Sequence, residues 1–333
     1  MRTKERLTLR GVCFALLVTA AVLRVAMLLG GQGGQAAALF FGLGLLPEQL
    51  RVQERPSVPA DEPAATAEPT FPTLEYHSPA RTLLFTAADA ALVDIANGPN
   101  ADLDPAALIT QPISFDLTAE GPLVLIVHTH ATESYTCADG DDYETDEPYH
   151  TEDTQFNVVR VGQALCDRLN EHGIAAVHDE TLYDAAGYYD AYERTAEGIA
   201  AYLAQYPSIQ MVIDVHRDSI DDGDGGELAL TTTLGGQEAA RLLLVMGTDI
   251  AGLTHPNWRE NLSFAMQLQA LCERDAPGLF RQMSLRSQRY NEHLTPHSIL
   301  VEVGAAGNTL RQALRSVEFL ADELTELLQA AGE

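Results

Sequence analysis

Short apolar runs separated by amphipathic helical segments fill the chain after Pro122, and this alternation constrains the fold more than any other feature. The runs are typical of buried strands and cover residues 123–130, 174–180, 209–218 and 298–307. The predicted helices cover residues 154–173, 188–207, 260–278 and 308–331, and residues 228–247 resemble a hairpin. Strands separated by helices of this length predict an α/β fold, with a mostly parallel sheet and helices on both faces.

The helical periodicity also indicates which side chains face the core. One apolar face of the helix at 154–173 consists of Val158, Val161, Leu165 and Leu169. Cys166 lies on the same side and is expected to be a small core residue. Tyrosines at helical spacing in 188–207, Tyr188 and Tyr192, are expected to belong to the core or to line a substrate groove. The last helix should be capped by Asn308 or Thr309.

The N-terminal region predicts a membrane anchor. Residues 1–11 form a basic tail, and residues 12–32 are apolar except for Thr19 and Arg24. The apolar run is long enough to cross ~30 Å of hydrocarbon as a helix. Basic residues before a span tend to stay in the cytoplasm, so the rest of the chain is expected outside it. A cleaved signal peptide is the alternative, but its apolar core is usually only about 7 to 15 residues long.

The anchor is followed by a change in composition. Residues 33–75 are rich in Pro, Ala and Glu near their end and predict a tether without a core. Residues 76–120 are expected to form an irregular or partly helical collar, and residues 121–333 the main domain.

Charge and cysteine content exclude two classes of protein. The formal net charge is -28, so the surface repels phosphate backbones and nucleic-acid binding is disfavoured. The four cysteines include no C-x-x-C pair, and three of them follow the predicted anchor: Cys137, Cys166 and Cys272. A disulfide framework is therefore not expected to organise the fold.

Ionisable residues occur where three predicted strands end. His128 and His130 close the first strand, His216 lies near the end of the strand at 209–218, and Glu302 interrupts the apolar run at 298–307. In open α/β sheets, ligands bind beyond the carboxyl ends of the strands. A buried carboxylate flanked by Val301 and Val303 is costly without a cation or a proton. These residues therefore indicate a divalent metal site, and the donor types suit catalytic zinc.

Spacing alone leaves the choice between His128 and His130 open. Both would point the same way if the strand continued through them, and the turn that follows could bring Glu133 to the same metal. The acidic segment 139–153 lacks the residue order of an EF-hand and is expected to be a solvated loop or a lid. Ser134 has no G-x-S-x-G elbow around it, and Cys137 has no local sign of activation.

Three stretches in the same order resemble the stage II sporulation protein P family: GPLVLIVHTHATESY, YPSIQMVIDVHRDSI and EHLTPHSILVEVGAAGNTLRQALRSVEFLADEL. The resemblance covers roughly residues 80–330. It implies a fold similar to that of zinc-dependent N-acetylmuramoyl-L-alanine amidases. It also implies a membrane-anchored peptidoglycan hydrolase with amidase and endopeptidase activity, which acts in engulfment during endospore formation.

The resemblance also implies roles for individual residues. His130 and His216 would be Zn²⁺ ligands, and Glu302 would be the catalytic carboxylate. The third ligand would be Glu133 by the family's HTHxxE pattern, whereas classical zinc amidases suggest a residue before the first helix, here Glu152 or Asp153. The expected partners are peptidoglycan and membrane-associated engulfment proteins, such as the lytic transglycosylase stage II sporulation protein D.

Other residues have supporting roles in this interpretation. His128 and Arg217 would lie around the metal, with Arg217 steadying a carboxylate or pairing with Asp214 or Asp218. His293 and His297 would either line the groove or form hydrogen bonds within their loop. Two other functions remain open: a wall-binding scaffold without catalysis, and a zinc carboxypeptidase or endopeptidase that cuts peptide bonds of peptidoglycan.

Overall fold

The computed structural model describes residues 83–138 and 148–332, which belong to one compact unit, Pro69–Glu333. The predicted basic tail, anchor and tether lie outside the described residues, as do residues 76–82 of the collar and 139–147 of the acidic segment. Within the described ranges, no helix combines the length and apolar character that a membrane span requires.

A seven-stranded sheet in the order β1-β8-β7-β9-β4-β2-β3 forms the centre of the molecule. Its strands are β1 (Ile95–Asn97), β2 (Val124–Val127), β3 (Ala176–His178), β4 (Met211–Asp218), β7 (Leu242–Met246), β8 (Met283–Leu285) and β9 (Ile299–Ala305). All neighbouring pairs are parallel except β7 and β9, which run antiparallel. The prediction of a mostly parallel sheet is confirmed.

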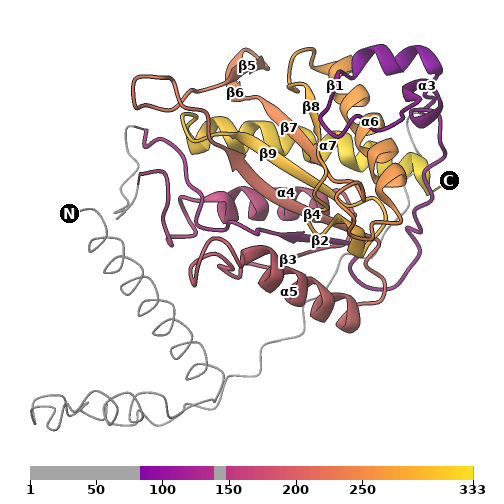
Figure 1. The fold of residues 1–333 in the computed structure, drawn as a ribbon, viewed down its shortest axis with the longest axis horizontal. Helices are drawn as coiled ribbons and strands as arrows, with labels where there is room; N and C mark the ends of the chain where they lie inside the picture. Colours follow the sequence, from indigo (N-terminus) through magenta and orange to yellow (C-terminus); the bar gives the residue numbers. More distant parts are fainter. Residues whose placement is uncertain (1–82, 139–147, 333) are drawn as a thin grey trace, which may run out of the picture. The chain divides into compact units, whose positions relative to one another are not determined.

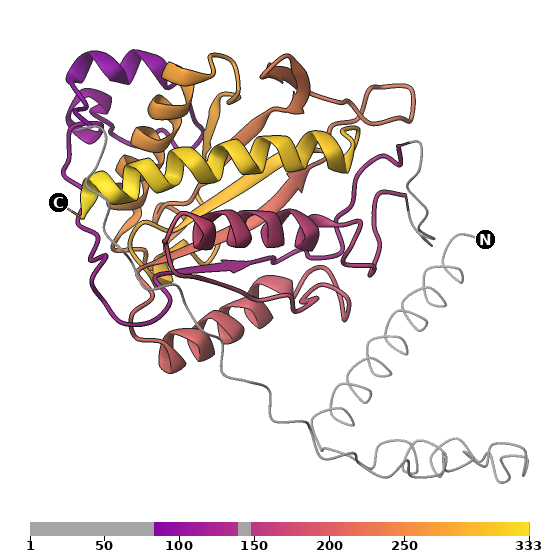
Figure 2. The same ribbon diagram turned by 180° about the vertical axis from the view of Figure 1, so that it is seen from behind.

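Helices cover the two faces of this sheet unequally. On one face lie α4 (Val158–Glu171), α6 (Trp258–Asp275) and α7 (Leu310–Ala331), which Figure 2 shows in front of the strands. On the other face α5 (Ala191–Gln205) packs near β2, where Ile199 contacts Leu125 and Val127 (Figure 1). Leu243, Val245 and Leu300 lie on this second face and are covered by Tyr290 instead of a helix.

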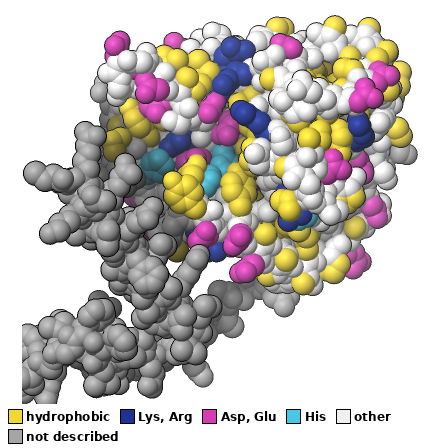
Figure 3. Space-filling view, in the orientation of Figure 1, with side chains coloured by type: hydrophobic (Ala, Val, Ile, Leu, Met, Phe, Trp, Pro, Cys, Tyr) yellow, Lys and Arg dark blue, Asp and Glu magenta, His cyan; other side chains and the backbone are white. Residues whose placement is uncertain are grey.

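The surface of this second face is hollowed. Figure 3 shows histidine and carboxylate side chains gathered in a depression, with arginine side chains beside it. An incompletely covered sheet face next to the ends of several strands is a common location for a ligand site.

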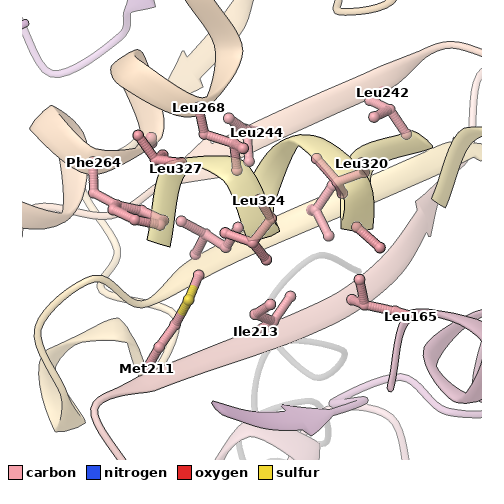
Figure 4. Close-up of a cluster of buried hydrophobic side chains, with 14 of the residues drawn as sticks. Leu165, Met211, Ile213, Leu242, Leu244, Phe264, Leu268, Leu320, Leu324 and Leu327 are labelled. Carbon is pink, nitrogen blue, oxygen red and sulfur yellow. The ribbon is translucent and has the colours of Figure 1, made fainter. Parts of the chain in front are cut away.

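The main core lies between the sheet and the three helices of the first face. Met211, Ile213, Leu242 and Leu244 of the strands meet Leu320 and Leu324 of α7, as Figure 4 shows. The side chains of Ile213 and Leu324 are completely inaccessible to solvent. Cys166 is buried in the same cluster, as expected, and burial raises the pKa of its thiol to about 12, so it is inert.

The ends of two helices follow from local hydrogen bonding. Asn157 caps α4 by accepting a hydrogen bond from the backbone of Val159. Thr309 caps α7 in a capping box with Gln312. Of the two caps that the sequence suggested, Asn308 and Thr309, the structure therefore has Thr309. Each cap satisfies a backbone N–H that the helix itself leaves unpaired.

Two segments match the expectation in part. The predicted hairpin is a pair of short strands, β5 (Thr231–Leu234) and β6 (Gln237–Ala240), joined at Gly235 and Gly236, which both have positive φ. Arg241 then separates β6 from β7, which joins the main sheet. The segment expected to be a collar contributes η2 (Ala87–Leu92), α3 (Pro105–Leu108) and the edge strand β1.

Candidate active site

Four residues predicted from the sequence lie in one pocket on the second face of the sheet. His130 and Glu133 follow β2, His216 lies in β4, and Glu302 lies in β9. The pocket has a volume of about 800 Å³. His216 and Glu302 are partners in the register of β4 and β9, so the sheet itself places them side by side.

The structure separates the two histidines after β2. The strand ends at Val127, so the alternation of an extended chain does not extend through both residues. His128 is fully buried, with Nδ1 2.9 Å from the carbonyl of Val215 and Nε2 2.8 Å from Nε2 of His178. Burial lowers the pKa of His128 to about 4. A neutral His128 therefore donates to Val215 and accepts from His178, and its role is structural.

His130 instead faces the pocket. Its ring stacks on Tyr188 with centroids 4.0 Å apart and makes an edge contact with His216 at 5.4 Å. Burial, followed by the nearby His216, lowers the pKa of His130, which favours the neutral ring that can donate a lone pair. Its Nδ1 is buried and has no hydrogen-bond partner in the described part of the chain.

His216 lies between two carboxylates. Its Nε2 is 2.9 Å from Oδ1 of Asp214, as an ion pair rather than a well-directed hydrogen bond, and its Nδ1 is 3.5 Å from Oε2 of Glu133. Burial alone would lower the pKa of His216, but Asp214 and Glu133 outweigh it and raise this pKa well above its usual value. Thr129 fixes Asp214 by donating its backbone N–H and its hydroxyl, at 2.9 and 2.6 Å.

Arg217 steadies Glu133, as the sequence suggested. Its backbone N–H donates to Oε2 of Glu133 at 3.1 Å, and its guanidinium lies 3.7 Å from Oε1. Burial opposes ionisation of Glu133, but His216 and Arg217 together lower its pKa, so this carboxylate is charged. The alternative pairings of Arg217 are not formed, because Asp214 pairs with His216 and Asp218 with Arg281.

Glu302 has a different environment from Glu133. Burial raises the pKa of Glu302 to about 8, and the charge of Glu133 adds to this effect against the opposing charge of His216. Its Oε2 has no hydrogen-bond partner among the described residues. Two neighbouring carboxylates whose pKa values are shifted in opposite directions are typical of a site that uses one for charge and the other for proton transfer.

Tyrosines form one wall of the pocket. Tyr188 covers His130, Tyr192 stacks over His216 with centroids 6.5 Å apart, and Tyr290 contacts Tyr192. Burial raises the pKa of Tyr192 far above its usual value, and the carboxylates of the site act in the same direction. These phenols therefore stay neutral and offer hydroxyl donors and flat apolar surfaces to a ligand.

The donor set fits zinc, although the side chains do not form a complete metal cluster. Among the described residues, no three His, Cys, Asp or Glu side chains stand ready to hold a metal ion. However, two ligands about 2.0 Å from one zinc ion at the tetrahedral angle are roughly 3.3 Å apart. The 3.5 Å between Nδ1 of His216 and Oε2 of Glu133 is close to that spacing. The unpartnered Nδ1 of His130 supplies a third donor in the same pocket.

The remaining sequence candidates lie outside this arrangement. His297 is buried between Phe115 and Phe264, and His293 packs near His255. Neither residue lines the pocket, which was one of the two roles considered for them. Asp153 accepts a hydrogen bond from the backbone of Gln155 just before α4. Glu152 is exposed, and neither of these two carboxylates lines the pocket.

The sequence analysis missed Asp214 as a residue of the site. Asp214 is two positions before His216, so strand alternation puts both on one face, and this signal was available in DVHRD. Tyr188 was expected in the core or along a groove, and it lines the pocket. Its contact with His130 gives no signal in the sequence, because it depends on the turn that leads into α5.

Comparisons with known proteins agree with the resemblance seen in the sequence. The sequence model of the family described as stage II sporulation protein P matches residues 66–325. Stage II sporulation protein P of Bacillus subtilis (strain 168) is 28% identical over 221 residues, which cover 63% of this chain and 52% of the relative. The chain thus spans about half the length of this curated relative.

Solved structures with a similar arrangement include two N-acetylmuramoyl-L-alanine amidases. AmiC2 of Nostoc punctiforme aligns with a TM-score of 0.40 at 12% identity, over 63% of this chain and 99% of the amidase. An amidase from Clostridium difficile 630 aligns with a TM-score of 0.36 at 13% identity, over 63% of this chain and 95% of the other. The family match covers most of the chain, including every pocket residue named above, and this chain belongs to the stage II sporulation protein P family.

Proposed function

We propose that this protein is a peptidoglycan hydrolase of sporulation that cleaves the amide between N-acetylmuramic acid and the stem peptide. The observation that carries the proposal is the meeting of His130, Glu133, His216 and Glu302 in one pocket at the ends of β2, β4 and β9. Family membership supports a role in sporulation. Crosslink endopeptidase activity and a place in engulfment belong to the same proposal and rest on the family resemblance.

His130, Glu133 and His216 would hold zinc. When bound, the metal would polarise the scissile carbonyl and make a bound water more acidic. Asp214, which Thr129 holds in place, orients the ring of His216 from its other nitrogen, and Arg217 fixes Glu133. These contacts keep the donors in position before any ligand arrives.

Glu302 is the proposed general base and acid. Its Oε2 is buried, lacks a hydrogen-bond partner among the described residues and borders the pocket. A carboxylate in this position accepts the proton of the attacking water and then returns it to the leaving amine. The raised pKa of Glu302 suits the second step, because it favours the protonated carboxyl that donates to the leaving amine. The first step needs the ionised form, which a cation bound in the pocket would favour.

The substitution Glu302→Gln tests this assignment. It keeps the shape of the side chain but removes its ability to accept a proton, so cleavage of purified peptidoglycan should fall by roughly 10²- to 10⁴-fold. Metal content, measured by atomic emission, should stay at the wild-type level. Glu318→Gln on the exposed side of α7 is the matched control and should retain full activity. Normal cleavage by Glu302→Gln would refute the mechanism.

The variant His216→Ala separates metal binding from proton transfer. It should lose both bound zinc and activity, because a ligand is removed and Glu133 loses its neighbour. A stoichiometric zinc content in this variant would show that His216 is not a ligand. A folded wild-type protein that bound peptidoglycan without releasing fragments would favour the scaffold alternative.

We also propose, from the resemblance and the predicted anchor at 12–32, that the protein is held in the cell membrane with residues 121–333 outside the cytoplasm. The proposed partners are other engulfment proteins, such as the lytic transglycosylase stage II sporulation protein D. Removing residues 1–32 should release the protein from the membrane fraction.

A further inference from the structure

A second groove extends from the candidate active site across the uncovered face of the sheet. It has a volume of about 370 Å³ and shares Tyr192, Asp218, Tyr290 and Glu302 with the first pocket. The two cavities are therefore neighbours, with Glu302 between them. A ligand whose reacting bond lies at Glu302 can therefore extend into this groove.

The strand register defines the floor of the groove. Leu300 on β9 pairs with Val245 on β7, Val245 pairs with Ser284 on β8, and Ser284 pairs with Ala96 on β1. All four residues line the groove, so they form one row across four strands. With strands about 4.8 Å apart, three spacings give this row a length of roughly 14 Å. Leu243 opposite Glu302 extends the apolar floor to the active site.

Two arginines line this groove, and one of them has no acidic partner among the described residues. Arg281 lines it near the active site, where its guanidinium pairs with Asp218 at 2.6 Å. Arg286 lines it beyond the end of β8 and is exposed. The guanidinium of Arg286 forms no hydrogen bond or ion pair with any described residue, so its charge is free for a ligand.

Cations here are unusual for this chain. The protein has 20 basic and 48 acidic residues, and the adjoining pocket contains the carboxylates of Glu133, Asp218 and Glu302. The negative charge of this site would repel an anionic ligand unless nearby cations compensated that charge. Arg286 provides such a positive charge at the far part of the groove.

The separation between Glu302 and Arg286 also matches the length of a short peptide. Arg286 follows Leu285, which pairs with Met246, so its backbone is four residues along the sheet and two strands away from Glu302. Strand geometry makes this separation roughly 16 Å. An extended chain of about five residues spans that length. The stem peptides of peptidoglycan are of this size and carry free or amidated carboxylates on their acidic residues.

We propose that this groove binds the stem peptide of the substrate, with the row of residues across the four strands under its backbone and Arg286 pairing with a free carboxylate of the peptide. The proposal rests on the proposed function and adds a determinant of specificity to it. Peptides with free carboxylates would be preferred over peptides whose carboxylates are amidated.

Steady-state kinetics with two soluble muropeptides test the proposal, one with free carboxylates and one with the same carboxylates amidated. The wild-type protein should cleave the free-carboxylate substrate with the higher kcat/KM. In Arg286→Gln the ratio of the two kcat/KM values should fall roughly threefold to tenfold, through a rise in KM for the charged substrate. Arg286→Lys should recover part of this preference.

The exposed Arg311 on α7 provides the matched control, because Arg311→Gln removes the same charge outside the groove. The ratio should stay at the wild-type value in this control. If wild type and Arg286→Gln were both active and had the same ratio of kcat/KM values, the groove assignment would be overturned. The proposed hydrolase function would still stand. Failure of the wild-type protein to cleave either substrate would instead refute the proposed function.

Discussion

At the scale of single residues, the histidines of the candidate site differ in their surroundings. His130 and His216 line the pocket, whereas His128 uses both of its nitrogens inside the core. The ring of His128 packs so closely against α4 that a Cβ atom at position 162 would lie 2.4 Å from its Nε2. Glycine at position 162 is therefore required by the pair of His128 and His178 rather than by the backbone of α4.

The two histidines of HTH should respond differently to substitution. His128→Ala removes the contacts of this ring with the carbonyl of Val215 and with Nε2 of His178 and leaves a buried cavity, which should cost about 2 to 4 kcal/mol of unfolding free energy. His130→Ala should cost less than about 1 kcal/mol but abolish zinc binding and activity. Chemical denaturation and metal analysis on both variants measure these effects. A larger loss of stability in His130→Ala, with zinc binding and activity lost only in His128→Ala, would contradict the proposed roles.

The sequence predicted much of this residue pattern. Histidines after apolar runs and a glutamate inside one indicated the pocket, because parallel strands bring their ends together. The choice of His130 came from the family pattern, since the end of β2 at Val127 cannot be read from its composition. The cover of Tyr188 over His130 depends on tertiary packing and left no local signal.

At the scale of elements, the sheet is predictable where each strand carries its own signal. The long buried strands β4 and β9 were found, because β9 is mostly apolar and β4 begins with three apolar residues. The edge strand β1 has three half-buried residues and exists because β8 lies beside it, so its sequence alone does not identify it. β7 was assigned to a hairpin, because its partner β9 follows more than fifty residues later.

An ionic contact joins α4 to α7 and gives a pH-dependent term in stability. Arg168 in α4 and His172 just after it both contact Asp322 in α7. Oδ1 of Asp322 lies 2.7 Å from Nε of Arg168 and 2.8 Å from Nε2 of His172. Burial opposes ionisation of Asp322, but these two partners lower its pKa below the usual 3.8. A carboxylate with a lowered pKa in the folded state stabilises the fold above its unfolded pKa and loses that contribution as the pH falls.

Asp322→Asn should therefore be less stable than the wild type at pH 6, and the difference should narrow as the pH falls below about 4. Thermal unfolding of both proteins between pH 3 and pH 7 measures it. Glu318→Gln on the exposed side of α7 removes a negative charge without this contact and should show no such narrowing. A difference that stayed constant down to pH 3 would show that the contact does not act through the charge of Asp322.

At the scale of the whole molecule, one face of the sheet provides stability and the other provides the site. Three helices and the main hydrophobic core occupy the first face, whereas α5 and a wall of tyrosines leave the second face partly open. The antiparallel junction of β7 and β9 places the apolar row of the groove beside Glu302. The fold thus places the proposed reacting centre and the proposed peptide groove on neighbouring parts of one face.

The bond that is cleaved is the most direct test of this account. Purified peptidoglycan should be digested with the full-length protein and with Glu302→Gln, and the released fragments analysed by mass spectrometry. The account predicts stem peptides with a free N-terminal alanine and glycan strands that keep an unsubstituted lactyl group, both absent with Glu302→Gln. Shortened or uncrosslinked stem peptides still attached to muramic acid, without free N-terminal alanine, would contradict it.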